Sequence, residues 1–193
     1  ALHVCISGAA SVLKSIADIP YSTVMSAMCA NGIITGIKMS GTGEHWFTAP
    51  SPIIKGRYLN PAWTEDDTVP LAGDSTMVEV YGLGGLSAAA SPAVTLLAGG
   101  NVEDAVRRTK DMWKISLGKH PQYGIPLLDF EGSPAGVDVM KVLETGIVPQ
   151  SHAGIILKKG GQAGAGVAEI PMQCFVKAFS RFVDSLSKEE VQG

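Results

Sequence analysis

The sequence predicts an α+β fold of mixed α/β type, in which a hairpin-containing sheet packs against helices. A hairpin is indicated by Asn31-Gly32 between two strand-like segments, 22–30 and 33–40, because Asn-Gly readily adopts the two positive φ angles of a type I′ turn. Helices are indicated by apolar residues at helical spacing, most clearly over 175–186. Strands and helices do not alternate strictly, so a purely parallel sheet is not favoured.

The first part of the chain is expected to hold one helix and several strands. Residues 3–17 place apolar side chains at helical spacing and stop before a proline. After the hairpin, the segment 40–43 (Ser-Gly-Thr-Gly) predicts a loop, and 46–49 predicts a short strand. Residues 50–73 contain four prolines and three neighbouring acids, which predicts a long loop excursion. The whole chain, 1–193, is expected to form a single α+β region.

The second part alternates apolar segments with glycine-rich turns. Asn101 is expected to cap a helix with Asp104 at the third position, and Gly118 is expected to end this helix. The other expected elements are a strand at 77–81, a turn at 82–85, an alanine-rich helix at 86–98, a strand at 125–130, a turn at 132–136, a helix at 137–144, a strand at 152–157, a loop at 160–166 and a helix with Pro171 in its first turn.

Composition and charge exclude several classes of protein. Among 193 residues 17% are charged and 46% are hydrophobic, which is incompatible with a disordered chain or a coiled coil. Fifteen basic and 18 acidic residues give a net charge of −3 without a block of either sign, so neither nucleic acid nor an acidic membrane is an expected partner.

The location expected from the sequence is the cytoplasm. The three widely spaced cysteines fit neither a disulfide framework nor a zinc site and are interpreted as small apolar side chains in a reducing compartment. The uncharged stretches 19–37 and 80–102 lack the Leu, Ile and Phe density of a membrane span. The chain begins inside a predicted helix without a basic leader, which suggests a fragment or a processed chain rather than a signal peptide.

The segment 82–85 (Gly-Leu-Gly-Gly) is a candidate anion site. It lies between a predicted strand and a predicted helix, where backbone N–H groups and the helix dipole bind phosphate or carboxylate. The amides of Gly84 and Gly85 would make these contacts. A plain tight turn is the alternative, and a nicotinamide cofactor is weakly supported because Ser87 occupies the third glycine position of the dinucleotide fingerprint.

A second glycine-rich loop, 160–166, also leads towards a helix. Gln162 offers an amide that could bond a carboxamide or a carboxylate, and Gly164 lies within the same loop. A flexible connection is the alternative. No Gly-Lys-Ser/Thr follows either loop, which excludes a Walker A motif.

Polar residues near the predicted hairpin form the third candidate. Ser40 and Thr42 supply hydroxyls, and His45 is the candidate acid–base catalyst or oxyanion donor, although a structural role is the alternative for a lone histidine. Asp129, at the end of an apolar segment, is a candidate substrate-binding carboxylate, while Asp138 is better explained as a helix cap. No histidine pair has metal-ligand spacing, and no nucleophile elbow is present.

Six motifs follow one another along the chain: 28–32 (MCANG), 40–43 (SGTG), 46–50 (WFTAP), 82–85 (GLGG) before the alanines, 125–138 (IPLLDF with Gly132, Pro134, Gly136 and Asp138) and 161–166 (GQAGAG). In this order they resemble one family, the YlbE-like (YahG/YlbE) proteins of unknown function, over nearly the whole chain. Family members are longer, so the chain is similar to their C-terminal portion only.

The resemblance implies a function that the residues alone do not establish. The family is linked to oxamate carbamoyltransferase of allantoin catabolism, which exchanges oxalurate and phosphate for oxamate and carbamoyl phosphate, and its members accompany FdrA-like subunits. This implies a subunit or fragment of a carbamoyltransferase in a homo- or hetero-oligomer, with a small anionic substrate and no cofactor or metal. In that reading Ser40 and Thr42 bind phosphate oxygens, and Asn31 and Gln162 bind the amide.

Two other functions compete with this one. The chain could be a non-catalytic scaffold or ligand-binding subunit of a metabolic enzyme complex, whose small residues let helices pack closely against a partner. A nicotinamide-dependent oxidoreductase rests on the segment 82–85 alone and is the weakest hypothesis. Convergence of the candidate loops on one pocket would favour catalysis.

Overall fold

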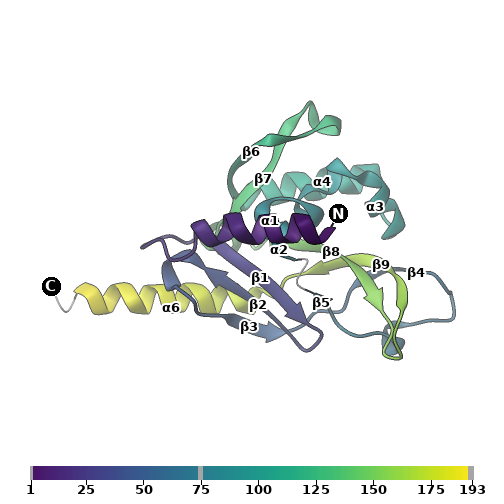
Figure 1. Cartoon of the computed structure of the whole chain (residues 1–193), viewed down its shortest axis with the longest axis horizontal. Coiled ribbons are helices and arrows are strands. Elements are labelled where there is room, and N and C mark those ends of the chain that lie inside the picture. The colour runs from purple at the N-terminus through teal and green to yellow at the C-terminus, as the bar shows by residue number, and fades with distance from the viewer. Residues whose placement is uncertain (1, 74–75, 191–193) are drawn as a thin grey trace.

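The computed structural model describes residues 2–73 and 76–190 and has the predicted α+β class (Figure 1). The helices are α1 (Leu2–Ser15), α2 (Met77–Tyr81), α3 (Pro92–Leu97), α4 (Val102–Lys114), α5 (Val139–Thr145) and α6 (Met172–Glu190). The strands are β1 (Met25–Asn31), β2 (Ile34–Met39), β3 (Phe47–Pro50), β4 (Lys55–Tyr58), β5 (Ala72–Gly73), β6 (Ser116–Ile125), β7 (Glu131–Val137), β8 (Gln150–Ile156) and β9 (Gln162–Glu169).

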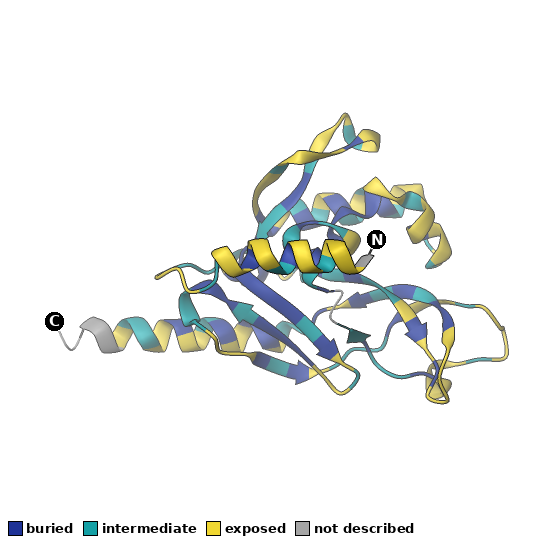
Figure 2. Cartoon of the chain, viewed as in Figure 1, coloured by how far each residue is buried: buried dark blue, intermediate teal, exposed yellow. Residues whose placement is uncertain are grey.

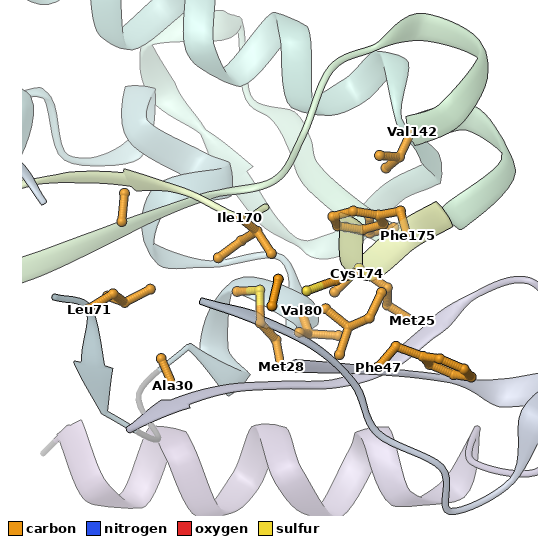
Figure 3. Close-up of a cluster of buried hydrophobic side chains, with 14 of the residues drawn as sticks. Met25, Met28, Ala30, Phe47, Leu71, Val80, Val142, Ile170, Cys174 and Phe175 are labelled. Carbon is orange, nitrogen blue, oxygen red and sulfur yellow. The ribbon is translucent and has the colours of Figure 1, made fainter. Parts of the chain in front are cut away.

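The main sheet has the order β3-β2-β1-β5, and all its pairs are antiparallel. Helix α6 packs on β2 and β3, whereas α1 packs on β1 and α2. Figure 3 shows Cys174 and Phe175 of α6 on one side of the strands, among Met25, Met28 and Val142, with α1 on the other side. Strands β1 and β2 of this sheet are largely buried, whereas β5 is only partly buried (Figure 2).

The predicted β1–β2 hairpin is confirmed, but its turn is not of type I′. Ala30 pairs with Thr35, so four residues form the connection. Gly32 has a positive φ of 85°, and Asn31 has none, whereas a type I′ turn requires both. The side-chain oxygen of Asn31 instead accepts the backbone N–H groups of Ile33 and Ile34, at 3.0 and 2.9 Å.

A second sheet, of order β4-β9-β8, corrects two expectations from the sequence. The segment 50–73, expected as a loop, contains β4 and the edge strand β5 besides irregular connections. The glycine-rich segment 160–166 is not a loop that precedes a helix. Gly160 and Gly161 form a hairpin turn with φ of 91° each, and the rest of the segment is the start of β9.

Glycines in β9 are required by the closeness of β4. A Cβ atom at Gly164 would collide with the backbone carbonyl of Arg57, and one at Gly166 would collide with that of Lys55. The small residues of β9 therefore reflect close packing between strands. From the sequence alone, such a run looks the same as a flexible loop.

The β6–β7 hairpin corrects three further expectations. Helix α4 ends at Lys114, so Gly118 lies within β6 and does not end the helix. The segment 125–130 contains only the last residue of β6, followed by a 3-10 turn and by Asp129 and Phe130 with positive φ of 53° and 59°. The segment 132–136 belongs to β7 and is not a turn. The antiparallel pairing with β7 holds β6 in an extended conformation. The residues of β6 have little β-propensity of their own, so the sequence did not predict this strand.

The segment 77–81 is a helix, and the predicted strand is wrong. The sequence did not distinguish the two, because an apolar run of this length fits either element. Gly82, with φ of 109°, ends it in the left-handed conformation. The expected alanine-rich helix, 86–98, is two pieces: a 3-10 segment over Gly84–Ala90, with Ser87 outside helical geometry, and α3, which begins at Pro92.

The remaining helices confirm their predicted signals. Asn101 and Asp104 form a reciprocal capping box at the start of α4, with N–H···O distances of 2.7 and 3.0 Å. Asp138 caps α5 by accepting the N–H of Met140 at 2.9 Å. Of the helices in the described part of the chain, none is both long enough and apolar enough to cross a membrane.

Replacing Gly164 tests the close approach of β4 and β9. We expect Gly164→Ala to lower the free energy of unfolding by about 1–3 kcal/mol, because overpacking forces backbone shifts. Gly118→Ala is the matched control, since nothing lies within 4 Å of its Cβ position. Urea unfolding of both variants measures the difference, and equal stability of the two would contradict this account of β9.

Candidate functional site

The carboxyl group of Glu79, in α2, is the centre of the candidate site. Its Oε1 accepts hydrogen bonds from the backbone N–H of Gly85 (3.1 Å), the hydroxyl of Ser151 (3.2 Å) and the backbone N–H of His152 (3.2 Å). Its Oε2 is buried and has no hydrogen-bond partner among the described residues. One oxygen is therefore held by the fold, and the other is unpartnered.

Short local signals hold α2 in place. The hydroxyl of Thr76 donates to the carbonyl of Met28 in β1 at 2.8 Å, and Val78 and Val80 are buried on either side of Glu79. Gly82 ends the helix, and a Cβ atom at Gly84 would collide with the Glu79 carboxyl group. Small residues after α2 thus bring the next backbone amides onto this carboxylate.

A cleft of about 620 Å³ opens beside Glu79. Its walls come from α2, from the start of the 3-10 segment and from the β8–β9 hairpin, and they include Val78, Glu79, Gly84, His152, Ile156 and Gln162. The volume is in the range typical of small-molecule sites.

The two ionisable groups of the cleft have shifted pKa values in opposite senses. Burial raises the pKa of Glu79 to about 7, although its hydrogen bonds favour the charged form. Burial, and to a smaller extent the positive charge of Arg108, lower the pKa of His152 to about 4. The Nε2 atom of His152 is buried and has no hydrogen-bond partner within the described ranges.

This arrangement can exchange a proton near neutral pH. At pH 7 Glu79 is close to its pKa, which is the condition under which a carboxyl group works best as a general acid or base. Because Oε1 already accepts three hydrogen bonds, the proton of the neutral form belongs on Oε2. His152 is neutral at this pH and can serve as a hydrogen-bond donor or acceptor.

No cluster of three or more metal-ligating side chains occurs among residues 2–73 and 76–190. The cleft itself contains one carboxylate and one imidazole from this set, Glu79 and His152.

Comparisons with known proteins identify relatives of the chain. The family model described as oxamate carbamoyltransferase subunit AllG matches residues 1–75. YahG of Escherichia coli (strain K12), an uncharacterized protein, is 39% identical over 162 residues, which are 83% of this chain and 34% of YahG. Oxamate carbamoyltransferase subunit AllG of the same organism is 37% identical over 173 residues, which are 88% of this chain and 41% of AllG. The chain is homologous to YahG and AllG.

A solved structure shares the fold of this YahG and AllG homologue. The crystal structure of a conserved protein of unknown function from Enterococcus faecalis V583 matches with a TM-score of 0.90 and 38% identity, over 94% of this chain and 44% of that one. The resemblance to the YahG family predicted from the sequence is thus confirmed, as is a relationship to a carbamoyltransferase subunit. The chain spans less than half the length of these relatives.

The structure brings together part of the candidate set predicted from the sequence. Gly84 and Gln162 line the cleft, and Gly85 donates its N–H to Glu79. In the glycine-rich segment 82–85, the amide of Gly85 thus bonds a carboxyl group of the chain itself, and the binding of a substrate anion there stays a prediction. Gln162 donates to the carbonyl of Gly164 at 3.0 Å, while Gly164 lies inside the β4-β9-β8 sheet.

The candidates near the first hairpin lie outside the cleft. Asn31 is exposed beside an apolar groove, and His45 is exposed with its ring centre 4.8 Å from that of Phe47. Ser40 is buried, where its hydroxyl donates to the carbonyl of Ile16. Thr42 donates to the carbonyl of Met39 at 2.7 Å. These bonds give Ser40 and Thr42 a structural role. The binding roles predicted for Asn31, Ser40, Thr42 and His45 stay predictions.

Asp129 also lies apart from the cleft, exposed in the β6–β7 connection. Sequence inspection missed Glu79 and His152 instead. A single acid within the apolar run 77–81 was the available signal for Glu79, because a charged residue in such a run must be buried with partners or face a cavity. His152 carries no comparable signal.

The raised pKa of Glu79 makes stability depend on pH. With its pKa raised from 4.5 to about 7, the folded state binds this proton more tightly than the unfolded state, so the contribution of Glu79 falls as pH rises from 4.5 to 7. The lowered pKa of His152 acts in the opposite sense between 4 and 6.5. We therefore expect the free energy of unfolding of Glu79→Gln minus that of wild type to increase by about 2 kcal/mol as pH rises from 5 to 8.

Urea unfolding at four pH values between 5 and 8 measures this change. Glu103→Gln is the matched control, because Glu103 is exposed on α4, and its difference from wild type is expected to stay constant. A constant difference for Glu79→Gln as well would show that Glu79 is not protonated by burial.

Proposed function

We propose that this chain is part of a carbamoyltransferase subunit that binds a small ureido acid of the oxalurate or oxamate type, together with phosphate or carbamoyl phosphate, in the cleft beside Glu79. The observation that carries the proposal is a proton-bearing carboxyl group, with an unpartnered oxygen, in a cleft of a homologue of AllG. An FdrA-like companion and a cytoplasmic location belong to the same proposal.

The chemistry requires a proton donor at the leaving nitrogen. In phosphorolysis a phosphate oxygen attacks the ureido carbonyl carbon and forms a C–O bond, while the bond from this carbon to the amide nitrogen breaks and leaves its electron pair on nitrogen. The nitrogen then takes a proton, which the neutral carboxyl group of Glu79 can supply through Oε2. In the reverse direction the carboxylate takes this proton back.

Two further groups of the cleft suit the other parts of such a substrate. The side chain of Gln162 can bond a carboxamide or a carboxylate, and neutral His152 can donate to an oxygen that becomes negative as phosphate attacks. Glu79 takes the acid–base role that the sequence assigned to His45, since His45 does not reach this cleft.

A second candidate function, a scaffold or ligand-binding subunit, is favoured by a different observation. An apolar groove of about 330 Å³ lies along β1, β2 and β3, and its lining includes Ala30, Ile34 and the 41% exposed side chain of Trp46. Such a surface suits protein contacts, and it is compatible with catalysis in the cleft on another part of the chain.

Substitutions in the cleft test the enzymatic proposal. In the longest form of the protein, assembled with its companion subunits, we expect Glu79→Gln to lower kcat for oxalurate phosphorolysis about 100-fold, which is a usual contribution of a general acid. We expect Gln162→Ala to raise KM about tenfold, because one hydrogen bond to a charged group is lost. Wild-type activity is expected to fall as pH rises above about 7, and this decline should be absent in Glu79→Gln.

Glu103→Gln, an exposed change on α4, serves as the control and should keep wild-type kinetics. His45→Ala separates the two candidate acids: loss of activity in this variant, with full activity in Glu79→Gln, would contradict the proposed role of Glu79.

A further inference from the structure

A second polar cavity, of about 300 Å³, lies on the same face of the β4-β9-β8 sheet as His152. Its charged and amide groups are Lys55 of β4, Arg108 of α4, Gln150 of β8 and Glu169 of β9. The register explains their convergence. Lys55 and His152 both pair with Val167, and Gln150 pairs with Glu169 two residues further along, so these side chains share one face.

Arg108 lines this cavity and has an unsatisfied donor. Helix α4 buries Ala105, Thr109 and Met112, which holds Arg108 beside the packed face. Its Nη1 atom is buried and has no hydrogen-bond partner in the described part of the chain. By contrast, the neighbouring Arg107 is exposed and pairs with Asp104. A buried guanidinium nitrogen without an acceptor is costly and rare in folded proteins.

Gln150 lines the same cavity and has an unsatisfied acceptor. Its Nε2 donates to Oε1 of Glu169 at 3.4 Å, which assigns the amide nitrogen to the side of the carboxylate. Its Oε1 is buried and has no partner among the described residues. The cavity therefore combines a cationic donor, Arg108, with an acceptor, Gln150, and adds one cation and one carboxylate at its rim.

We propose that this cavity binds a small α-amino acid as its zwitterion. The carboxylate accepts from Arg108, whose terminal bonds rotate to bring Nη1 onto it, and it lies near the ammonium of Lys55. The amino group of the ligand donates to Oε1 of Gln150 and faces the carboxylate of Glu169. Opposite charges thus meet at both ends of the ligand, and both unsatisfied atoms acquire partners.

This inference does not rest on the proposed carbamoyl transfer, because it concerns another cavity and a binding step only. The positive charge of Arg108 already reaches His152, where it helps to lower the pKa of the imidazole. A ligand that neutralises the charge of Arg108 would therefore raise the pKa of His152 in the cleft beside Glu79.

Calorimetric titration of the purified protein, in its longest form, with glycine tests the site. Acetate is the probe that lacks the amino group, and we expect it to bind at least tenfold more weakly than glycine. We expect Arg108→Gln to weaken glycine binding at least tenfold and Lys55→Gln to weaken it severalfold. Gln150→Leu should weaken the binding of glycine but not that of acetate.

Arg107→Gln is the matched control, because it removes the same charge from the adjacent, exposed position and should leave glycine binding unchanged. Lys55 is exposed on an outer strand, so its variant tests the site even if Arg108→Gln unfolds the protein. Equal affinities for glycine and acetate, or no glycine binding at millimolar concentration, would overturn the inference. Binding of oxamate but not glycine, lost in Glu79→Gln and kept in Arg108→Gln, would also overturn it while supporting the proposed function.

Discussion

Burial of one carboxyl group links the parts of this protein that form the cleft. Oε1 of Glu79 receives donors from Gly85 and from Ser151 and His152, which lie more than 70 residues further along the chain. Helix α2 contacts β1 of the main sheet, whereas Ser151 and His152 belong to the second sheet. A buried carboxyl oxygen requires such partners, so the same bonds that satisfy Oε1 also fix the second sheet against α2.

Predictions from the sequence succeeded where the deciding interaction is local. The capping box of Asn101 and Asp104, the cap at Asp138 and the Asn31-Gly32 hairpin all depend on residues within four positions of each other. They failed where a distant partner decides. Residues 162–166 form a strand only because β4 and β8 lie on both sides of them, and their own composition favours a loop.

The candidate site was predicted in part for the same reason. The backbone amides of Gly84 and Gly85 were expected to bind a substrate anion, whereas the bond in the structure runs from the Gly85 amide to Glu79, three residues before Gly82. Nothing in the local sequence shows that β8 adds two more donors to the same oxygen. The glycines thus indicated an amide near an acidic group, while the identity of that group depended on tertiary structure. The hydroxyl of Ser40 likewise has partners that the local sequence does not show, because it bonds the backbone of Ile16 and Ile19 in the α1–β1 connection.

The charges of the two polar cavities are coupled through one histidine. His152 lies in the cleft beside Glu79, and its pKa is lowered by burial and by Arg108, which lines the other cavity. A cation near a neutral imidazole keeps the imidazole neutral, because a second positive charge would be repelled in a poorly solvated region. Glu79 then remains the one ionisable group of the cleft that changes protonation near pH 7, chiefly because burial keeps His152 neutral and to a smaller extent because of Arg108, a residue of α4 that does not line the cleft.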